Sequence, residues 1–365
     1  MKVPFVNLGL QYAGLKEEIL KVFDELASTG NYVLNSKLKA FEEEFADYCG
    51  TKFSVGVGNG TDALFLSLLA LGVGSGDEVI TAPNSFIASA GAIGTLGAKP
   101  VFVDVGPDYN MDPEQIESAI TSRTKALMPV HLTGRIANMD GILSIARKHG
   151  LPIVEDSAQA VGAAYKGKRA GSFGITGCFS LHPLKNLHIH GDGGMITTDD
   201  EGLYDQFLKM RNHGLKNRDE CEFWGWNSRL DGIQAAIGSL KLQHLDEWNQ
   251  RFRDIADRYS RELAGVVTVP THEVHEEPVY HRYVIQHDRR DELMKHLEKQ
   301  GVETKVNYPI PLHLQAPARA LGHNEGDFPV AEKQASRILS LPLYPELKDN
   351  QVGHVIEAVQ SFPNT

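Results

Sequence analysis

Hydrophobic residues recur every three or four positions near the start of the chain. Leu15, Ile19, Phe23 and Leu26 fall on one side of the segment LKEEILKVFDEL, which predicts an amphipathic helix from Leu15 to Leu26. A second helix is expected from Lys37 to Tyr48. The chain is therefore predicted to begin with two helices before its first strand.

Between residues 53 and 154, short hydrophobic runs alternate with segments of helical periodicity. Strands separated by helices of this length form a mainly parallel sheet that helices cover on both faces. The pattern therefore predicts an α/β fold. The expected strands are Phe53–Val57, Glu78–Thr81, Pro100–Val105, Ala126–His131 and Leu151–Val154, and the helices between them are Gly60–Leu71, Phe86–Leu96, Glu114–Ile120 and Met139–His149.

In the second half of the chain the regular alternation of strands and helices ends. One long helix is expected from Asp231 to Leu263, and a smaller α/β domain after it. We predict a large domain over residues 1–250 and a small C-terminal domain over residues 251–365. The other expected elements are the strands Gly177–Leu181, Met195–Thr198 and Val279–Gln286 and the helices Asp200–Asn212, Arg290–Gln300, Pro329–Ile338 and Gln351–Gln360.

Composition excludes several classes of protein. The net charge is −11 over 365 residues, which argues against nucleic acid as the main partner. The three cysteines, Cys49, Cys178 and Cys221, are odd in number and widely spaced, which fits neither a disulfide framework nor a zinc site. There is no apolar run long enough to cross a bilayer, and the N-terminus lacks the pattern of a signal peptide, so we expect a cytoplasmic protein.

Candidate chemistry follows three of the predicted strands. Gly58 to Asp62 opens a helix after the first strand, where backbone N–H groups, the helix dipole and the Thr61 hydroxyl suit a phosphate. Asp156 follows the fifth strand, and Lys185 follows the sixth. Taken singly, these features fit an ordinary turn, a helix cap and a surface lysine at least as well.

Together the three features are much more specific. The carboxyl ends of parallel strands meet at one edge of a sheet, so Gly60–Thr61, Asp156 and Lys185 are expected to lie near one another. Pyridoxal phosphate carries a phosphate, a pyridine nitrogen and an aldehyde, which need these three kinds of group. The glycine spacing is not that of a dinucleotide-binding turn, which disfavours a nicotinamide cofactor.

Several motifs then resemble the DegT/StrS-type sugar aminotransferases, which are pyridoxal-phosphate enzymes of fold type I. The resemblance runs from about Val6 to Ser361 and implies an aspartate-aminotransferase-like large domain with a smaller C-terminal domain. The motifs are GNGTDAL (58–64), EDSAQAVGA (155–163), SLHPLKNL with GDGG (180–194), RNHG (211–214), WNSRLDGIQAA (226–236) and YPIPLHLQ (308–315).

The resemblance implies roles for individual residues. Lys185 would form the Schiff base with the cofactor and carry the proton, and Asp156 would pair with the pyridine nitrogen. Asn227 would reach the phosphate of the neighbouring subunit, which implies a homodimer with shared active sites. The remaining cofactor contacts would be Gly60, Thr61 and Ser180 at the phosphate, Gln159 near the ring oxygen and Phe86 on the ring face; the substrate-side groups would be Arg229, Tyr308 and His313.

The resemblance also implies the reaction. Glutamate would donate an amino group to a keto group, at C3 rather than C4, of a nucleotide-linked hexose in amino-sugar biosynthesis, for lipopolysaccharide, O-antigen or another glycan. The alternatives on the same fold are a keto-inositol aminotransferase, a sugar dehydratase, or a regulatory protein without turnover. Related dehydratases replace the lysine with histidine, so Lys185 favours transamination. No metal is expected, and His188 and His190 have no assigned role.

Overall fold

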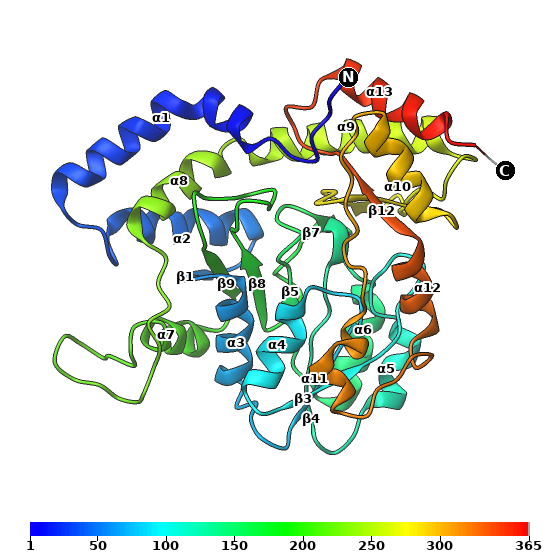
Figure 1. Cartoon of the computed structure of the whole chain (residues 1–365). Coiled ribbons are helices and arrows are strands. Elements are labelled where there is room, and N and C mark those ends of the chain that lie inside the picture. The colour runs from blue at the N-terminus through cyan, green and yellow to red at the C-terminus, as the bar shows by residue number, and fades with distance from the viewer. Residues whose placement is uncertain (364–365) are drawn as a thin grey trace.

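The computed structural model describes residues 1–363 and begins with two helices, α1 (Leu8–Thr29) and α2 (Ser36–Cys49). Helix α1 is longer than predicted and lies along the outside of the molecule beside α8 (Gly232–Leu242) (Figure 1). Leu15 and Ile19 pack against Ile237 of α8, whereas Phe23 is 52% exposed. Only one side of α1 is therefore covered within this chain.

A central sheet organises the larger part of the molecule. The central sheet consists of two parts, one with the strand order β1-β9-β8-β5 and one with the order β3-β2-β4. Isolated parallel bridges from Leu127 to Ile153 and from Val130 to Asp156 join the two parts. All neighbouring pairs are parallel except those of β9, which runs antiparallel to β1 and β8. The strands are β1 (Phe53–Val57), β2 (Glu78–Thr81), β3 (Lys99–Phe102), β4 (Thr124–Leu127), β5 (Val154–Asp156), β8 (Thr176–Ser180) and β9 (Gly194–Thr198).

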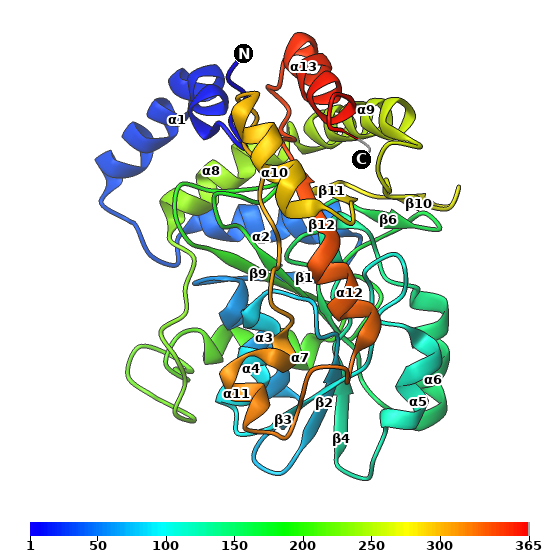
Figure 2. The same ribbon diagram turned by 45° about the vertical axis from the view of Figure 1, so that its right-hand side comes forward.

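Helices cover both faces of this sheet, as the alternating pattern predicts, so the α/β fold class is confirmed (Figures 1 and 2). Short antiparallel strands outside the sheet were not predicted, because two-residue strands leave no periodic pattern. These are β6 (Ala164–Tyr165), β7 (Lys168–Arg169) and β10 (Glu276–Glu277). The helices between strands are α3 (Gly60–Ala70), α4 (Ile87–Thr95), α5 (Pro113–Ala119), α6 (Met139–His149) and α7 (Glu201–Met210), with a 3₁₀ turn at Leu132–Gly134.

The predicted single helix from Asp231 to Leu263 is wrong. The structure has two helices there, α8 and α9 (Leu245–Leu263), separated by a turn at residues 243–244. Helix α8 packs on α1 and α2, whereas the buried stripe of α9 belongs to a different hydrophobic core that includes Phe252 and Tyr259. The chain turns because its two halves are buried against different partners.

The C-terminal part forms its own core around β11 (Tyr283–Gln286) and β12 (Ile338–Leu341), which pair in antiparallel fashion. Helices α9, α10 (Arg290–Lys299) and α13 (Asp349–Gln360) pack here, and Val3 from the N-terminus joins them. None of the helices among residues 1–363 is long and apolar enough to cross a membrane.

The connection between β11 and β12 returns to the central sheet. It contains a 3₁₀ turn (Leu312–Leu314), α11 (Ala316–Arg319) and α12 (Pro329–Arg337) (Figure 2). Leu312 and Phe328 belong to the same core as Ile80 and Phe102 of the sheet. The C-terminal segment thus closes one side of the region at the strand ends, and the domain boundary near residue 250 stays a prediction.

Candidate active site

A cavity of about 310 Å³ lies at the carboxyl ends of β5 and β8. This volume is at the lower end of the range for small-molecule sites. The cavity brings together eight of the predicted site residues: Gly60, Thr61, Phe86, Asp156, Gln159, Ser180, Lys185 and Tyr308.

The N-terminus of α3 forms one wall of the cavity. The Asn59 side chain caps this helix by accepting a hydrogen bond from the backbone N–H of Asp62 (2.8 Å). The first backbone hydrogen bond of the helix comes from Ala63, so the N–H groups of Gly60 and Thr61 precede it. A Cβ atom on Gly60 would lie 2.7 Å from the Ser180 Cβ, so glycine is required for α3 to approach β8 this closely.

Asp156 stands at the end of β5 and is 5% exposed. Burial raises the pKa of its carboxyl group, while the hydroxyl of Ser89 donates a hydrogen bond to Oδ2 (2.7 Å) and acts in the opposite direction. Ser85 in turn lies 2.7 Å from Ser89, oxygen to oxygen. Sequence reasoning missed these two serines, although their spacing of four residues at the start of a helix was a usable signal.

Lys185 lies in the loop after β8, where its backbone N–H donates to the carbonyl of His182 (2.8 Å). Burial lowers the pKa of its amine to about 8, an effect that Asp156 opposes and Arg282 reinforces. More of this amine is neutral near pH 8 than in a surface lysine, and the neutral amine is the nucleophilic form.

His188 supports the loop that carries Lys185. Its Nδ1–H donates to the backbone carbonyl of Lys185 (3.0 Å), and burial lowers its pKa to about 3, so the ring stays neutral and braces the lysine loop. The backbone of His190 is held by Gln234, and its ring meets the edge of Tyr12. Residues 1–363 contain no group of three or more side chains arranged to hold a metal ion.

The C-terminal segment forms another wall of the cavity. Tyr308 meets the ring of Phe86 at a centroid distance of 5.7 Å, and the Gln159 amide donates to its hydroxyl (3.5 Å). Burial raises the pKa of Tyr308 to about 12, so its hydroxyl stays protonated at neutral pH. The Gln159 carbonyl oxygen also accepts the backbone N–H of Thr133 (2.9 Å), which fixes the amide orientation.

Three predicted site residues lie outside this cavity. Asn227 is exposed, and Arg229 donates to the Asn212 side chain (3.1 Å). His313 is fully buried, where its Nε2 lies 2.9 Å from a Glu332 oxygen. The roles of these three residues stay predictions.

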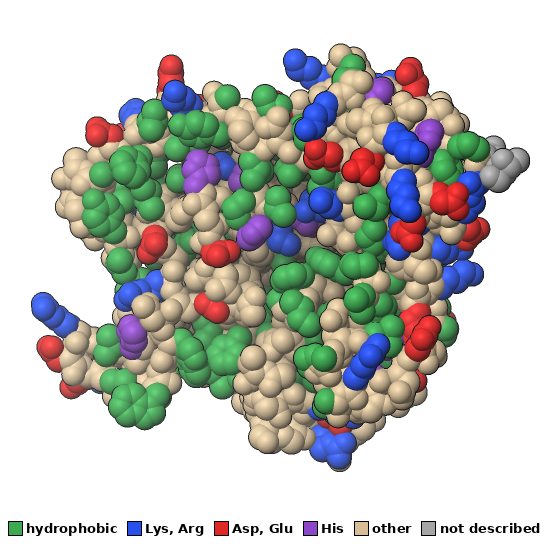
Figure 3. Space-filling view, viewed as in Figure 1, with side chains coloured by type: hydrophobic (Ala, Val, Ile, Leu, Met, Phe, Trp, Pro, Cys, Tyr) green, Lys and Arg blue, Asp and Glu red, His purple; other side chains and the backbone are tan. Residues whose placement is uncertain are grey.

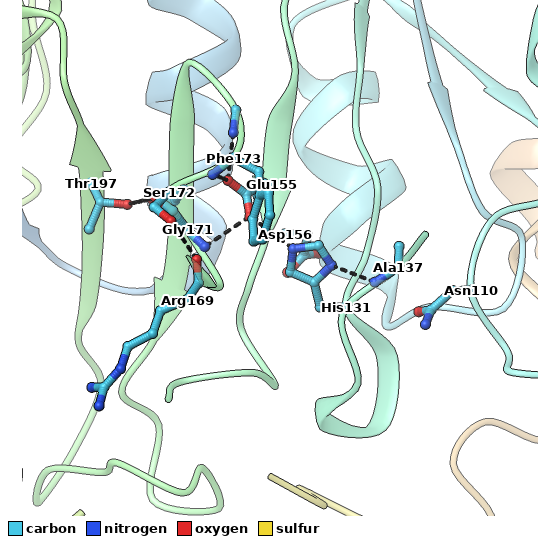
Figure 4. A network of polar contacts seen from close by, with 12 residues as sticks. Asn110, His131, Ala137, Glu155, Asp156, Arg169, Gly171, Ser172, Phe173 and Thr197 are labelled. Atoms are coloured by element: carbon cyan, nitrogen blue, oxygen red, sulfur yellow. Dashed lines mark hydrogen bonds and ion pairs between the residues drawn. The ribbon is translucent and has the colours of Figure 1, made fainter. Parts of the chain in front are cut away.

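Glu155 precedes Asp156 but belongs to a separate buried network (Figure 4). Its Oε2 lies 2.9 Å from His131 Nε2 and accepts the Gly171 N–H (2.8 Å). Since His131 Nδ1 accepts the Ala137 N–H (3.2 Å), its Nε2 must carry the proton that bonds Glu155. Oε1 accepts two more backbone N–H groups, so this acid is fully paired and serves the structure.

The cavity also contains residues that sequence reasoning missed. His281, Arg282 and Asn307 line it together with Lys185. The signal for Arg282 was a basic residue beside His281 inside the largely apolar strand pattern VYHRYVI.

Comparisons with known proteins agree with this geometry. The model of the DegT/DnrJ/EryC1/StrS aminotransferase family matches residues 14–360. A "Pleiotropic regulatory protein" of Geobacillus stearothermophilus is 46% identical over 99% of both chains. A "dTDP-3-amino-3,4,6-trideoxy-alpha-D-glucose transaminase" of Streptomyces venezuelae is 42% identical over 99% of this chain and 96% of its own.

Two solved structures superpose closely on this chain. DesV of S. venezuelae has a TM-score of 0.96 at 43% identity and 98% coverage of both chains. An aminotransferase of Brucella abortus has a TM-score of 0.96 at 35% identity and 100% coverage of both chains. The chain therefore belongs to the DegT/DnrJ/EryC1/StrS aminotransferase family.

Proposed function

We propose that this chain is a pyridoxal-phosphate-dependent aminotransferase that moves an amino group from glutamate to the C3 keto group of a nucleotide-linked hexose. One observation carries the proposal: a lysine with a lowered amine pKa, a buried carboxylate and the first N–H groups of a helix line the same cavity. Lys185, Asp156 and Gly60 supply these groups from three separate segments of the chain.

The residues present fit this cofactor. The N–H groups of Gly60 and Thr61 make no bond within the helix, and together with the Ser180 hydroxyl they suit a phosphate. Because residue 60 is glycine, these N–H groups can lie close to Ser180. When bound, pyridoxal phosphate supplies an electrophilic carbon and an electron-withdrawing ring.

The chain's own residues then supply binding and proton transfer. Lys185 Nζ would attach the cofactor and move the proton at the substrate carbon. Asp156, held by Ser89, would keep the ring nitrogen protonated. Phe86, the N-cap residue of α4, is 52% exposed and would cover one face of the ring.

The names of several relatives support a sugar substrate aminated at C3. Proteins 40–42% identical to this chain over 98–99% of its length include a "dTDP-3-amino-3,6-dideoxy-alpha-D-galactopyranose transaminase" of Aneurinibacillus thermoaerophilus and a "UDP-2-acetamido-2-deoxy-3-oxo-D-glucuronate aminotransferase" of Pseudomonas aeruginosa. The matched region extends over nearly the whole chain and so covers the segments that form the cavity. The same proposal puts the enzyme in the cytoplasm.

The reaction is tested in two halves. Purified enzyme loaded with pyridoxal phosphate is mixed with L-glutamate, and the cofactor absorbance is followed as the amino group is taken up. The enzyme that now carries the amino group on its cofactor is then mixed with matched 3-keto and 4-keto nucleotide sugars and with a keto-inositol. Return of the original absorbance with the 3-keto sugar supports the proposal. Preferential reaction with the 4-keto sugar or the inositol would contradict the substrate assigned.

A regulatory role without turnover predicts a different result. The relative from Geobacillus carries a regulatory name, but Lys185, Asp156 and the α3 turn are all present in this chain. A regulator would leave the cofactor absorbance unchanged with every amino donor. Uptake of an amino group from glutamate would exclude that alternative.

We also propose that the enzyme is a homodimer with shared active sites. Apolar side chains of α1 and the following loop are exposed, and Figure 3 shows hydrophobic side chains over this region at the upper left. Asn227 is exposed and outside its own cavity, as expected of a residue that acts in a neighbouring subunit. The exposed side chains include Leu20, Phe23, Tyr32, Val33 and Leu34.

Complementation tests this arrangement. Co-expressed Lys185→Ala and Asn227→Ala chains would form mixed dimers in which one site has both native residues. We expect activity in the mixture although each variant alone has little. If Asn227 acts within its own subunit, mixing restores nothing.

A further inference from the structure

An arginine without an acidic partner lines the cavity beside Lys185. Arg282 lies immediately before β11, and its Nη1 donates to the carbonyl of the preceding residue, His281 (2.9 Å). Within residues 1–363 no carboxylate lies within ion-pair distance of it. The partly buried Arg135 and the buried Arg211, by contrast, pair with Glu276 and Glu42.

Burial makes the unpaired charge of Arg282 energetically costly. Loss of hydration lowers the pKa of Arg282 to about 10, so the guanidinium remains charged at neutral pH. The guanidinium carbon lies 5.2 Å from the Phe5 ring centroid, within cation–π range, but an aromatic ring carries no net negative charge. Keeping a partly buried cation without a counter-charge is costly, and a bound anion would offset that cost.

The other charges in the cavity do not supply this counter-charge. Asp156 already accepts from Ser89, and Asp192 is exposed to solvent. Arg282 lines the same cavity as Lys185 and Tyr308, and its charge acts on both of these groups. An anion bound at Arg282 would therefore lie next to the point where the amino group is transferred.

We propose that Arg282 binds the α-carboxylate of the amino-acid donor, an inference that rests on the proposed function. In an α-amino acid only one carbon separates the reacting nitrogen from the carboxylate. The carboxylate must therefore lie close to Lys185, and Arg282 is the unpaired cation lining that part of the cavity. Its planar guanidinium can donate two parallel hydrogen bonds to a carboxylate. The cofactor phosphate has its own binding groups at α3, on a different wall.

Two substitutions test the proposal. Arg282→Gln removes the charge, and Arg282→Lys keeps the charge without the two-pronged geometry. Arg218→Gln, at an exposed loop position, is the control. In the loaded enzyme we expect Arg282→Gln to raise the apparent dissociation constant for L-glutamate at least about 30-fold, since losing one partner of a buried charge pair costs about 2 kcal/mol or more. Arg282→Lys should recover part of the loss.

Other ligands of Arg282 give different results. If affinity for the nucleotide sugar falls and that for glutamate does not, Arg282 binds an anionic group of the sugar and the proposal is wrong. If cofactor affinity falls instead, Arg282 binds the phosphate and the proposal is equally wrong. A purely structural role predicts a lower melting temperature for Arg282→Gln without ligand, whereas removal of an unpaired charge should leave it unchanged or raise it.

A binding measurement separates this proposal from the proposed function. Calorimetric titration of the pyridoxal-phosphate form with 2-oxoglutarate, the keto acid formed from glutamate, reports carboxylate binding without turnover, because neither partner then carries an amino group to transfer. Weaker binding to Arg282→Gln than to the native and Arg218→Gln proteins supports the role of Arg282 even if no sugar is aminated. Equal binding to all three overturns it even if the enzyme is an aminotransferase.

Discussion

Replacing Glu155 with glutamine should strongly destabilise the protein. Glu155 is fully buried, and its two oxygens accept four hydrogen bonds, three from backbone N–H groups and one from His131. The substitution keeps the shape of the side chain but turns one acceptor into a donor. The other oxygen can still accept the Phe173 and Gly174 N–H groups.

The size of the effect follows from the two bonds that are lost. The new amide NH₂ would face the Gly171 N–H and the His131 Nε2–H, and each buried donor without an acceptor costs about 1–3 kcal/mol. His131 cannot relieve this by moving its proton, because Nδ1 is already the acceptor for Ala137. With the loss of the charged acceptor, we expect a decrease of about 3–5 kcal/mol in the free energy of unfolding.

Urea unfolding followed by circular dichroism measures this change. Native and variant proteins are compared at one protein and one cofactor concentration, because binding and assembly shift apparent stability. Glu298→Gln, at an exposed position on α10, is the matched control and should change stability by less than about 0.5 kcal/mol. A loss below about 1 kcal/mol for Glu155→Gln, with an unchanged dependence on urea, would refute the reasoning.

Four further predictions concern the cofactor and the lysine that binds it. Lys185→Ala should fold but lose the covalent attachment of pyridoxal phosphate that borohydride reduction fixes; a fixed adduct on another residue would contradict the assignment. Covalent uptake by cofactor-free protein should rise through about pH 8, since only the neutral amine reacts and burial lowers the Lys185 pKa to about 8; a midpoint near the ordinary 10.5 would be inconsistent with this environment. Asp156→Asn should move that midpoint lower, because the carboxylate favours the charged lysine. Gly60→Ala should weaken cofactor binding by roughly tenfold or more through its clash with Ser180, whereas Gly14→Ala, where a Cβ meets open space, should bind normally; equal affinities would argue against a phosphate at α3.

Much of the cofactor end of the site could be predicted from the sequence. Gly60–Thr61, Asp156 and Lys185 each follow a strand, and parallel strands bring their carboxyl ends to one edge whatever the details of packing. The same regularity made the strands Phe53–Val57 and Glu78–Thr81 predictable to the residue. The motifs also identified the family correctly.

The substrate end could not be predicted in this way. Arg282 and Tyr308 reach the cavity from the C-terminal segment, and no local periodicity records which segment folds back over the strand ends. His313 has a chemistry that suits a substrate, but the structure pairs it with Glu332 in a buried position. Which polar residues face a cavity depends on contacts between distant segments.

The sequence by itself determined the alternating fold, the family and the three groups that suit pyridoxal phosphate, because these depend on local periodicity and on residues next to strand ends. Tertiary structure decided the break between α8 and α9, the supporting serines behind Asp156 and the separate role of Glu155. It also decided which cation stands unpaired beside Lys185. Each of these depends on which side chains of distant segments meet and on how much water their packing excludes.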